Sequence, residues 1–272
     1  MIPASMFSFL VILLITGLPV AIVLGLVSGG WIMVSGSSLK MLASRMYAGI
    51  DTFVLMAIPF FCLAGEIMNQ CGITTRLIQF VNYLIGRVRG GLAQANIYSS
   101  LLFAGITGAA VADVSALGSV FIPAMEKQGY TRKFSAMITA ASSIIGPIIP
   151  PSIIVVVYGA VTGVSVGTIF AATMIPGVIV GLSMSLFVAV IAKKKNFPKF
   201  EEKFELKGFC LCLKDSILAL IMPLIIIGGI FSGIFTPTEA AAVAVFYALI
   251  VGSVIYRTVT ISSIYQSLYN AM

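Results

Sequence analysis

The sequence contains no histidine and very little charge. Charged residues make up only 9% of its 272 positions, against about a quarter in an ordinary soluble domain. Without histidine, the commonest metal ligand and proton shuttle is missing, and a metalloprotease built on an H-E-x-x-H motif is excluded. The four cysteines have neither metal-ligand partners nor the spacing of a disulfide framework. They are best explained as small apolar side chains.

Hydrophobic residues, by contrast, make up 60% of the chain, and its mean hydropathy is +1.12. The first apolar run, Phe7–Val34, has no cleavage pattern of a signal peptide, so we expect a mature helix bent at Gly17-Leu-Pro19. Further apolar segments, most of a length that can cross a bilayer, lie near 51–70, 91–125, 134–163, 168–192, 216–234 and 237–256, and an amphipathic stretch begins near 259. These segments predict an all-α polytopic membrane protein.

Two of the segments are interrupted by residues that break helices. The first break is Gly105-Ile-Thr-Gly-Ala-Ala-Val-Ala-Asp113, and the second is Ala141-Ser-Ser-Ile-Ile-Gly-Pro-Ile-Ile-Pro-Pro-Ser152. Irregular backbone at membrane depth survives only where it is buried in protein or lines a cavity, and such breaks form the ion and substrate sites of secondary transporters. We expect a hairpin over 91–125. The three prolines of the second break predict an unwound segment rather than a kink, because proline cannot donate the helical hydrogen bond.

A lysine-rich stretch near residue 200 has the character of a cytoplasmic surface loop. The excess of 16 Lys and Arg over 9 Asp and Glu has the same explanation, so we expect no nucleic-acid partner. The loop separates a complete unit, about 1–192, from a shorter one, about 216–272. The shorter unit restarts the first, since Phe235-Thr-Pro-Thr-Glu239 lies near its beginning as Thr16-Gly-Leu-Pro19 does in the first. This pattern is compatible with the paired repeats of transporters.

Four motifs, in order, resemble the large membrane subunit of the TRAP (tripartite ATP-independent periplasmic) transporters. They are Gly105-Ile-Thr-Gly-Ala-Ala-Val-Ala-Asp-Val-Ser-Ala-Leu-Gly118, Ile122-Pro-Ala-Met-Glu-Lys-Gln-Gly-Tyr130, Thr139-Ala-Ala-Ser-Ser-Ile-Ile-Gly-Pro-Ile-Ile-Pro-Pro-Ser152 and Gly233-Ile-Phe-Thr-Pro-Thr-Glu-Ala-Ala-Ala242. The resemblance implies an elevator-type transporter with a re-entrant hairpin, broken helices and inverted repeats, of which the second is incomplete here. It implies scaffold and arm helices over 1–90, half of a transport domain over 91–192, a basic loop over 193–215 and the start of the second repeat over 216–272.

The resemblance also implies a function and partners. The function is sodium-coupled uptake of an organic acid, with C4-dicarboxylates, sialic acid, other sugar acids and keto acids left open as substrates. The partners are a small four-helix membrane subunit, a soluble periplasmic or lipid-anchored binding protein, and membrane lipid. The location is a bacterial or archaeal cytoplasmic (inner) membrane, and no organic cofactor is expected. Because family members contain roughly two repeats, the alternative is a truncated, transport-inactive remnant or a structural subunit.

The two breaks carry the expected ion and substrate site. Na⁺ is a hard cation that prefers oxygen ligands, which unwound carbonyls and hydroxyls supply. The tip has Ala109 and Ala110 where the family is richer in serine, so the ion must rely on other oxygens. We expect its ligands at Gly105, Thr107, Gly108, Ser142, Ser143, Gly146, Pro147 and Pro150. We expect the substrate at Thr107, Gly108 and Ser152.

Asp113 is the single acid within the hairpin motif, and two interpretations of it stay open. An acid at membrane depth is by default a functional residue. A carboxylate shortly after Gly108 also stabilises the positive end of the following helix dipole. An aspartyl protease would need a second acid close by, and a serine hydrolase would need a base that is hard to nominate here. We therefore do not expect an enzyme.

Overall fold

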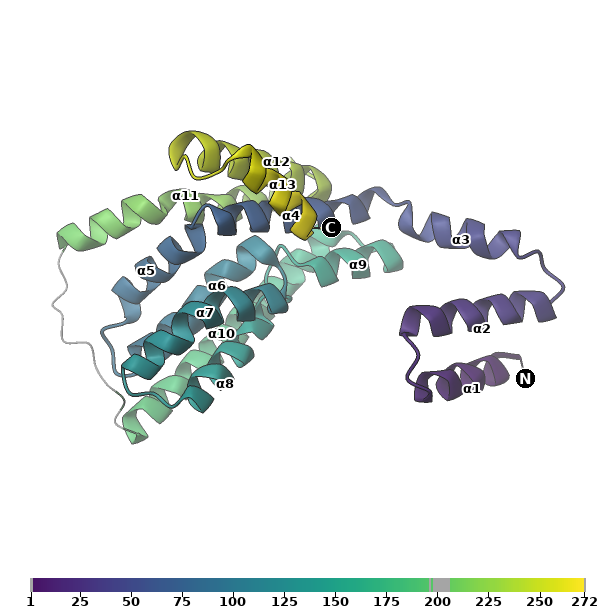
Figure 1. Cartoon of the computed structure of the whole chain (residues 1–272), viewed down its shortest axis with the longest axis horizontal. Coiled ribbons are helices and arrows are strands. Elements are labelled where there is room, and N and C mark those ends of the chain that lie inside the picture. Colours follow the sequence, from purple (N-terminus) through teal and green to yellow (C-terminus); the bar gives the residue numbers. More distant parts are fainter. Residues whose placement is uncertain (1, 196, 198–205, 272) are drawn as a thin grey trace. The chain divides into compact units, whose positions relative to one another are not determined.

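The computed structural model describes residues 2–195, 197 and 206–271, and within these ranges it consists of helices joined by turns and irregular links (Figure 1). The prediction of an all-α protein is confirmed. The chain divides into two compact units, Met1–Thr52 and Phe53–Met272. Four helical stretches of the described chain are long and apolar enough to cross a membrane: Phe53–Gln70, Val166–Lys194, Gly208–Phe231 and Pro237–Ile255.

The first unit contains the helices α1 (Ile2–Ile15), α2 (Val20–Val34) and α3 (Lys40–Ile50). α1 and α2 pack against each other, so the prediction of one bent helix over Phe7–Val34 is wrong. The chain reverses between them because Gly17 adopts a left-handed conformation, with φ of +78°, which glycine reaches at little cost. Pro19 then caps α2 with extended backbone. At 1.5 Å per residue, each of these two helices is only about 20 Å long.

The second unit begins with a short 3₁₀ turn, η1 (Phe53–Met56), and continues through helices that reverse direction several times. The first of these are α4 (Ala57–Gln70), α5 (Ile73–Ile85), α6 (Gly91–Thr107), α7 (Ala110–Lys127) and α8 (Arg132–Ser142). They are followed by η2 (Ser143–Ile145), α9 (Ile153–Thr162), α10 (Val166–Lys194) and α11 (Leu206–Phe231). The unit ends with α12 (Pro237–Ile250), a π-helical turn η3 (Val251–Ile255) and α13 (Ile261–Ala271).

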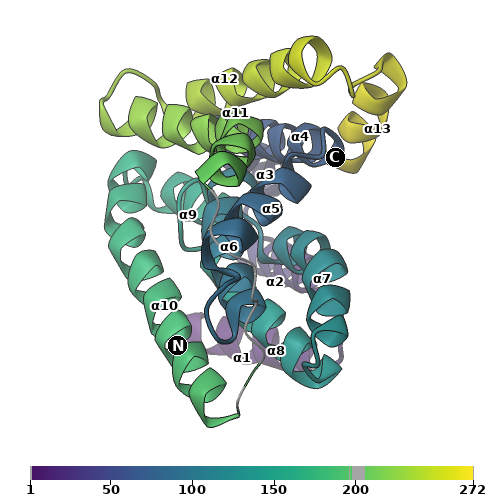
Figure 2. The same cartoon turned by 90° about the vertical axis from the view of Figure 1, so that its left-hand side faces the viewer.

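Helix α4 is covered by the two last helices of the chain. α12 lies along α4, and α13 turns back to pack on α4 as well (Figure 1, Figure 2). Thr236 and Glu239 form a capping box at the start of α12, with Pro237 in the first turn, an arrangement that satisfies otherwise unpaired backbone N–H groups. The Thr238 hydroxyl donates to the carbonyl of Phe53 at 3.0 Å, which ties α12 to η1.

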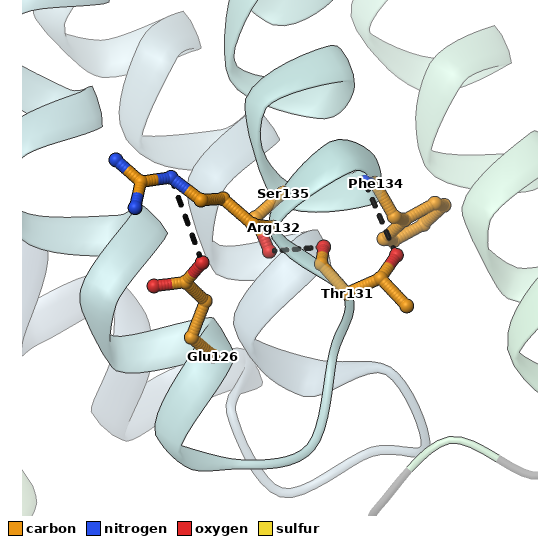
Figure 3. Close-up of polar contacts among 5 residues, drawn as sticks. All are labelled: Glu126, Thr131, Arg132, Phe134 and Ser135. Carbon is orange, nitrogen blue, oxygen red and sulfur yellow. Dashed lines mark hydrogen bonds and ion pairs between the residues drawn. The ribbon is translucent and has the colours of Figure 1, made fainter.

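A tight turn joins α7 to α8 (Figure 3). The Thr131 hydroxyl caps α8 by accepting from the backbone N–H of Phe134 at 3.3 Å, and Ser135 donates back to the Thr131 carbonyl at 3.2 Å. Glu126 and Arg132 form an ion pair across the turn at 3.8 Å, and such exposed pairs contribute little to stability. The turn thus places α8 beside α7, against which it packs.

Helix α11 begins earlier than the sequence indicates. It starts at Leu206, so residues 206–215, which we predict as part of the basic loop, are helical. The physical reason is that apolar residues continue on this side of the loop, and the ring of Phe209 lies 6.1 Å from that of Phe80 on α5. α10 extends through Lys194 on the other side. Residues 196 and 198–205 of the predicted loop lie outside the described residues.

Candidate functional site

The first predicted break forms the tip of a helical hairpin. α6 ends at Thr107 and α7 begins at Ala110, so only two residues separate two helices that pack side by side (Figure 1). Gly108 makes the reversal in a left-handed conformation with φ of +60°, and Ala109 is extended. The prediction of a hairpin within 91–125 is confirmed.

The second break is an unwound segment, as predicted. α8 ends at Ser142, a single 3₁₀ turn follows, and residues 146–152 form turns and bends before α9 begins. The Pro150–Pro151 peptide bond is cis. Ser152 closes the segment, because its hydroxyl donates to the Pro147 carbonyl at 2.6 Å and accepts from the backbone N–H of Val155 at 3.3 Å.

The hairpin tip lies directly against the unwound segment. A methyl group built on Gly108 would overlap the carbonyl oxygen of Pro151 and lie 3.0 Å from the Cα atom of Ser152. One built on Gly105 would lie 3.8 Å from the carbonyl oxygen of Pro150. The two breaks therefore meet backbone to backbone.

Asp113 links the tip to the unwound segment. It lies in the first turn of α7 and is fully buried. Its Oδ1 accepts from the Thr107 hydroxyl at 2.6 Å, whereas its Oδ2 has no hydrogen-bond partner among the described residues. A methyl group on Gly146 would lie 2.5 Å from this Oδ2. The helix-start position fits the structural interpretation of Asp113, and the unpartnered oxygen beside the second break leaves room for the functional one.

The structure separates the other predicted ion ligands into two groups. Gly105, Thr107 and Gly108 lie at the tip beside the unwound segment. Ser142, by contrast, lies against Ser100 on α6, whose hydroxyl donates to it at 2.9 Å. The hydroxyls of Ser142 and Ser143 both donate to the Thr139 carbonyl. Of the predicted substrate residues, Thr107 lines a pocket, whereas Ser152 is fully buried and occupied in capping α9.

A buried polar seam between α6 and α8 was not predicted from the sequence. Asn96 donates to the Thr139 hydroxyl at 2.7 Å, and Ser100 donates to Ser142 one helical turn further on. All four side chains are fully buried. The signal was available, because Asn96 and Ser100 are four residues apart in an apolar run, and Thr139 and Ser142 are three apart in another. Polar side chains at helical spacing within membrane-grade segments indicate contacts between helices.

Asn96→Ala is therefore expected to destabilise the protein by about 1 kcal/mol or more, because it removes a buried hydrogen bond and leaves the Thr139 hydroxyl with one partner fewer. The measurement is the midpoint of thermal unfolding in detergent. Ser99→Ala is the matched control on the same helix, since the buried Ser99 hydroxyl has no partner among the described residues. Equal midpoints for the two variants would contradict an energetic role for the seam.

A pocket opens beside the tip, enclosing about 590 Å³ of empty space including its mouth. Its walls come from α4, from the end of α6, from the first turns of α7, from α9 and from α13. Thr107, Ala109 and Ala112 line it from the tip and the start of α7, and Glu66, Asn69 and Asn270 line it from α4 and α13. The tip is thus accessible from one side and sealed against the unwound segment on the other.

Comparison with known proteins shows the family of the chain. A family model described as "Tripartite ATP-independent periplasmic transporter, DctM component" matches residues 7–272. The chain belongs to this family. The sialic acid TRAP transporter large permease protein SiaM of Vibrio cholerae is 42% identical over 94% of this chain, and the C4-dicarboxylate TRAP transporter large permease protein DctM of Pseudomonas aeruginosa is 38% identical over 85%. The isethionate TRAP transporter permease protein DctMQ of Oleidesulfovibrio alaskensis is 39% identical over 98%.

Membership in the TRAP large-permease family confirms the resemblance that the four motifs indicate. These relatives are named as transporter permeases and not as enzymes, and at the level of the family the chain belongs with multi-pass membrane proteins. The chain spans 60% of the length of the Vibrio protein, 54% of the Pseudomonas protein and 42% of the Oleidesulfovibrio protein.

Proposed function

We propose that this chain takes part in sodium-coupled secondary uptake of an organic acid anion by an elevator mechanism. The observation that carries the proposal is the meeting of two backbone breaks, the hairpin tip and the segment 146–152, around the buried carboxylate of Asp113. Irregular backbone at membrane depth is tolerated where it is buried in protein or lines a cavity, and in secondary transporters such breaks form the ion and substrate sites. The names of the relatives, which include sialic acid, isethionate and C4-dicarboxylate permeases, support an organic acid as the substrate.

The residues around Asp113 fit a sodium ion. The Oδ2 of Asp113 supplies a charged oxygen without a partner among the described residues, and Thr107 supplies a hydroxyl. Gly146, Pro147 and Pro150 belong to the unwound segment, which carries backbone carbonyls. Such a set suits a hard cation, and a bound cation would remove the cost of burying the Asp113 charge alone. Ser142 and Ser143 stay in the proposal as ligands, because a hydroxyl that donates to the Thr139 carbonyl still has a lone pair for a cation.

The elevator mechanism requires that the hairpin and the unwound segment move as one body. The polar seam joins α6 to α8, and the contact of Gly108 with Pro151 joins the tip to the residues that follow α8. These links support a moving unit that contains α6–α9, with the hairpin entering and leaving on one side of the membrane. Helix α4, with α12 and α13 packed on it, is our candidate for the scaffold.

The proposed partners follow from the family. They are a small four-helix membrane subunit and a periplasmic or lipid-anchored binding protein that delivers the acid. The proposed location is the cytoplasmic membrane of a bacterium, because the relatives named above are bacterial.

The test compares sodium with potassium. The chain is reconstituted into liposomes with the small subunit, the binding protein is added outside, and uptake of radiolabelled sialic acid and succinate is measured under an inward gradient of either ion. We expect uptake of one of the acids with the sodium gradient and at least tenfold less with potassium. We also expect sodium to raise the unfolding temperature of the purified chain more than potassium does, because an ion that binds only the folded state stabilises it. Equal results for the two ions in both measurements would refute sodium coupling.

A further inference from the structure

Helix α11 carries a proline in its interior. Pro223 lies within Gly208–Phe231, one of the apolar stretches long enough to cross a membrane. Proline cannot donate the helical hydrogen bond, so at this position it weakens the helix that contains it. The side chains on either side of it in the sequence are unequal, since Met222 is fully buried and Leu224 is exposed. The half-buried ring of Pro223 lies between these two faces.

The ring of Pro223 occupies the space that a side chain on Gly105 would need. A methyl group built on Gly105 would lie 3.0 Å from the Cβ atom of Pro223 and 3.3 Å from its Cγ atom. The same methyl group would lie 3.8 Å from the carbonyl oxygen of Pro150. Because Gly105 has no side chain, α6 and α11 can approach closely here. Pro223 thus packs against the last turn of α6, where that turn also faces the unwound segment.

Around this contact the packing between α11 and α6 is incomplete. An apolar cavity of about 370 Å³ lies beside it, between α5, α6, α10, α11 and the unwound segment. Gly105 and Pro223 both line the cavity, together with Leu101 from α6 and Leu220 and Leu224 from α11. Protein interiors are normally close-packed, and voids of this size are few. The ring of Pro223 therefore supplies the close contact that α11 makes with the last turn of α6.

This turn of α6 carries part of the candidate ion site. Gly105 and Thr107 belong to it, and Gly108 follows directly. The Thr107 hydroxyl donates to Asp113 at 2.6 Å. A helical turn moves nearly as one piece, because its backbone hydrogen bonds fix the residues relative to one another. The position of Thr107 beside Asp113 thus depends on where the neighbours of Gly105 hold the turn.

We propose, on the basis of the proposed function, that Pro223 is a positioning residue for the sodium site. Its ring acts through Gly105 and holds the last turn of α6 where Thr107 and Asp113 present their oxygens to the ion. A site held in its binding geometry binds more tightly, because less order has to be gained on binding. α11 also packs on α5 and α12, outside the proposed moving unit. The contact therefore links the ion site to the helices past which that unit moves.

The experiment moves the side chain from one helix to the other. Pro223→Gly leaves a gap beside Gly105, Gly105→Ala places a methyl group against the intact ring, and the double variant has the methyl group on α6 and none on α11. The unfolding temperature of each purified full chain is measured over a series of sodium concentrations, with potassium keeping the total salt constant. These curves give the sodium concentration for half-maximal stabilisation, because an ion that binds only the folded state stabilises it.

We expect each single variant to need at least threefold more sodium than the parent protein. The double variant should return to within twofold of the parent, because the methyl group fills the gap that the ring leaves. If Pro223→Gly does not fold, Pro223→Ala takes its place. It keeps the Cβ atom and loses the rest of the ring, so we expect it to need at least twofold more sodium.

Pro123→Gly is the matched control. Pro123 also lies inside a helix, α7, but it is exposed and lies more than three turns beyond the tip. It should change the unfolding temperature equally at every sodium concentration and leave the sodium requirement unchanged. The same behaviour in the Pro223 variants, or a double variant no better than the single ones, would overturn the inference while the proposed function stands. If sodium stabilises the parent protein no more than potassium does, both are overturned.

Discussion

Replacing Gly108 with alanine should prevent most of the protein from reaching its folded state. Two costs add at this position. The left-handed φ of +60° disfavours any residue with a Cβ atom by about 1–2 kcal/mol, and the new methyl group would overlap the carbonyl of Pro151. Its neighbours are backbone atoms, which cannot rotate away as a flexible side chain can, so overpacking adds about 1–3 kcal/mol or more. The measurement is the monodisperse fraction recovered from membranes by size-exclusion chromatography.

Gly163→Ala is the matched control for this substitution. Gly163 also has a left-handed conformation, with φ of +73°, but no atom lies within 4 Å of the position its Cβ would take. Alanine there carries the conformational cost without the overlap, so we expect a modest loss of stability and normal recovery. If both variants were recovered equally well, the contact between the tip and the unwound segment would not be the critical feature of the hairpin.

Asp113→Asn should raise the sodium concentration for half-maximal substrate binding at least tenfold while leaving the hairpin folded. Asparagine retains an oxygen that accepts from Thr107, so the contact at 2.6 Å can persist. The negative charge on the unpartnered oxygen is lost, and with it the strongest attraction for a cation in the site. Because coupling between two ligands is reciprocal, substrate affinity at a fixed sodium concentration should fall as well. Calorimetric titrations of the acid at several sodium concentrations measure both effects.

The controls for Asp113 are charge changes outside the site. Asp215→Asn removes an exposed carboxylate from α11, and neutralising Lys193–Lys195 removes positive charge at the end of α10. Both should leave the sodium dependence unchanged. An unchanged sodium response in Asp113→Asn itself would place the ion elsewhere and leave Asp113 with its role at the start of α7.

The sequence predicts the parts of this structure that depend on local backbone chemistry. Glycine at Gly108 reaches a left-handed conformation at little cost, and the prolines of the 146–152 segment cannot donate the helical hydrogen bond. Both breaks and their approximate positions therefore follow directly from residue types. The order of the apolar segments likewise follows from hydropathy. The resemblance to the TRAP family then adds the relation between the breaks, which single-sequence reasoning does not supply.

The features that the sequence does not predict depend on contacts between distant residues or on small differences in free energy between local conformations. Nothing near Asp113 in the sequence indicates that Gly146 packs against its carboxylate. The reversal at Gly17 was predicted as a bend, because an apolar run of this length satisfies a single tilted helix equally well. The lysines near residue 200 led to a predicted loop that extends too far, into the start of α11. Charge indicates where a loop lies but not where it begins and ends.

The polar seam between α6 and α8 has a consequence for alignment. Leucine and valine side chains can pack in many ways between helices surrounded by lipid, so apolar contacts alone leave two helices free to slip. Asn96 and Ser100 on α6 donate hydrogen bonds to Thr139 and Ser142 on α8, and both bonds form in the same register of the two helices. A shift of α8 by one turn, about 5.4 Å, would break both of these hydrogen bonds. The seam thus fixes the register of the hairpin against α8 to less than one turn, and this alignment brings Gly108 opposite Pro151.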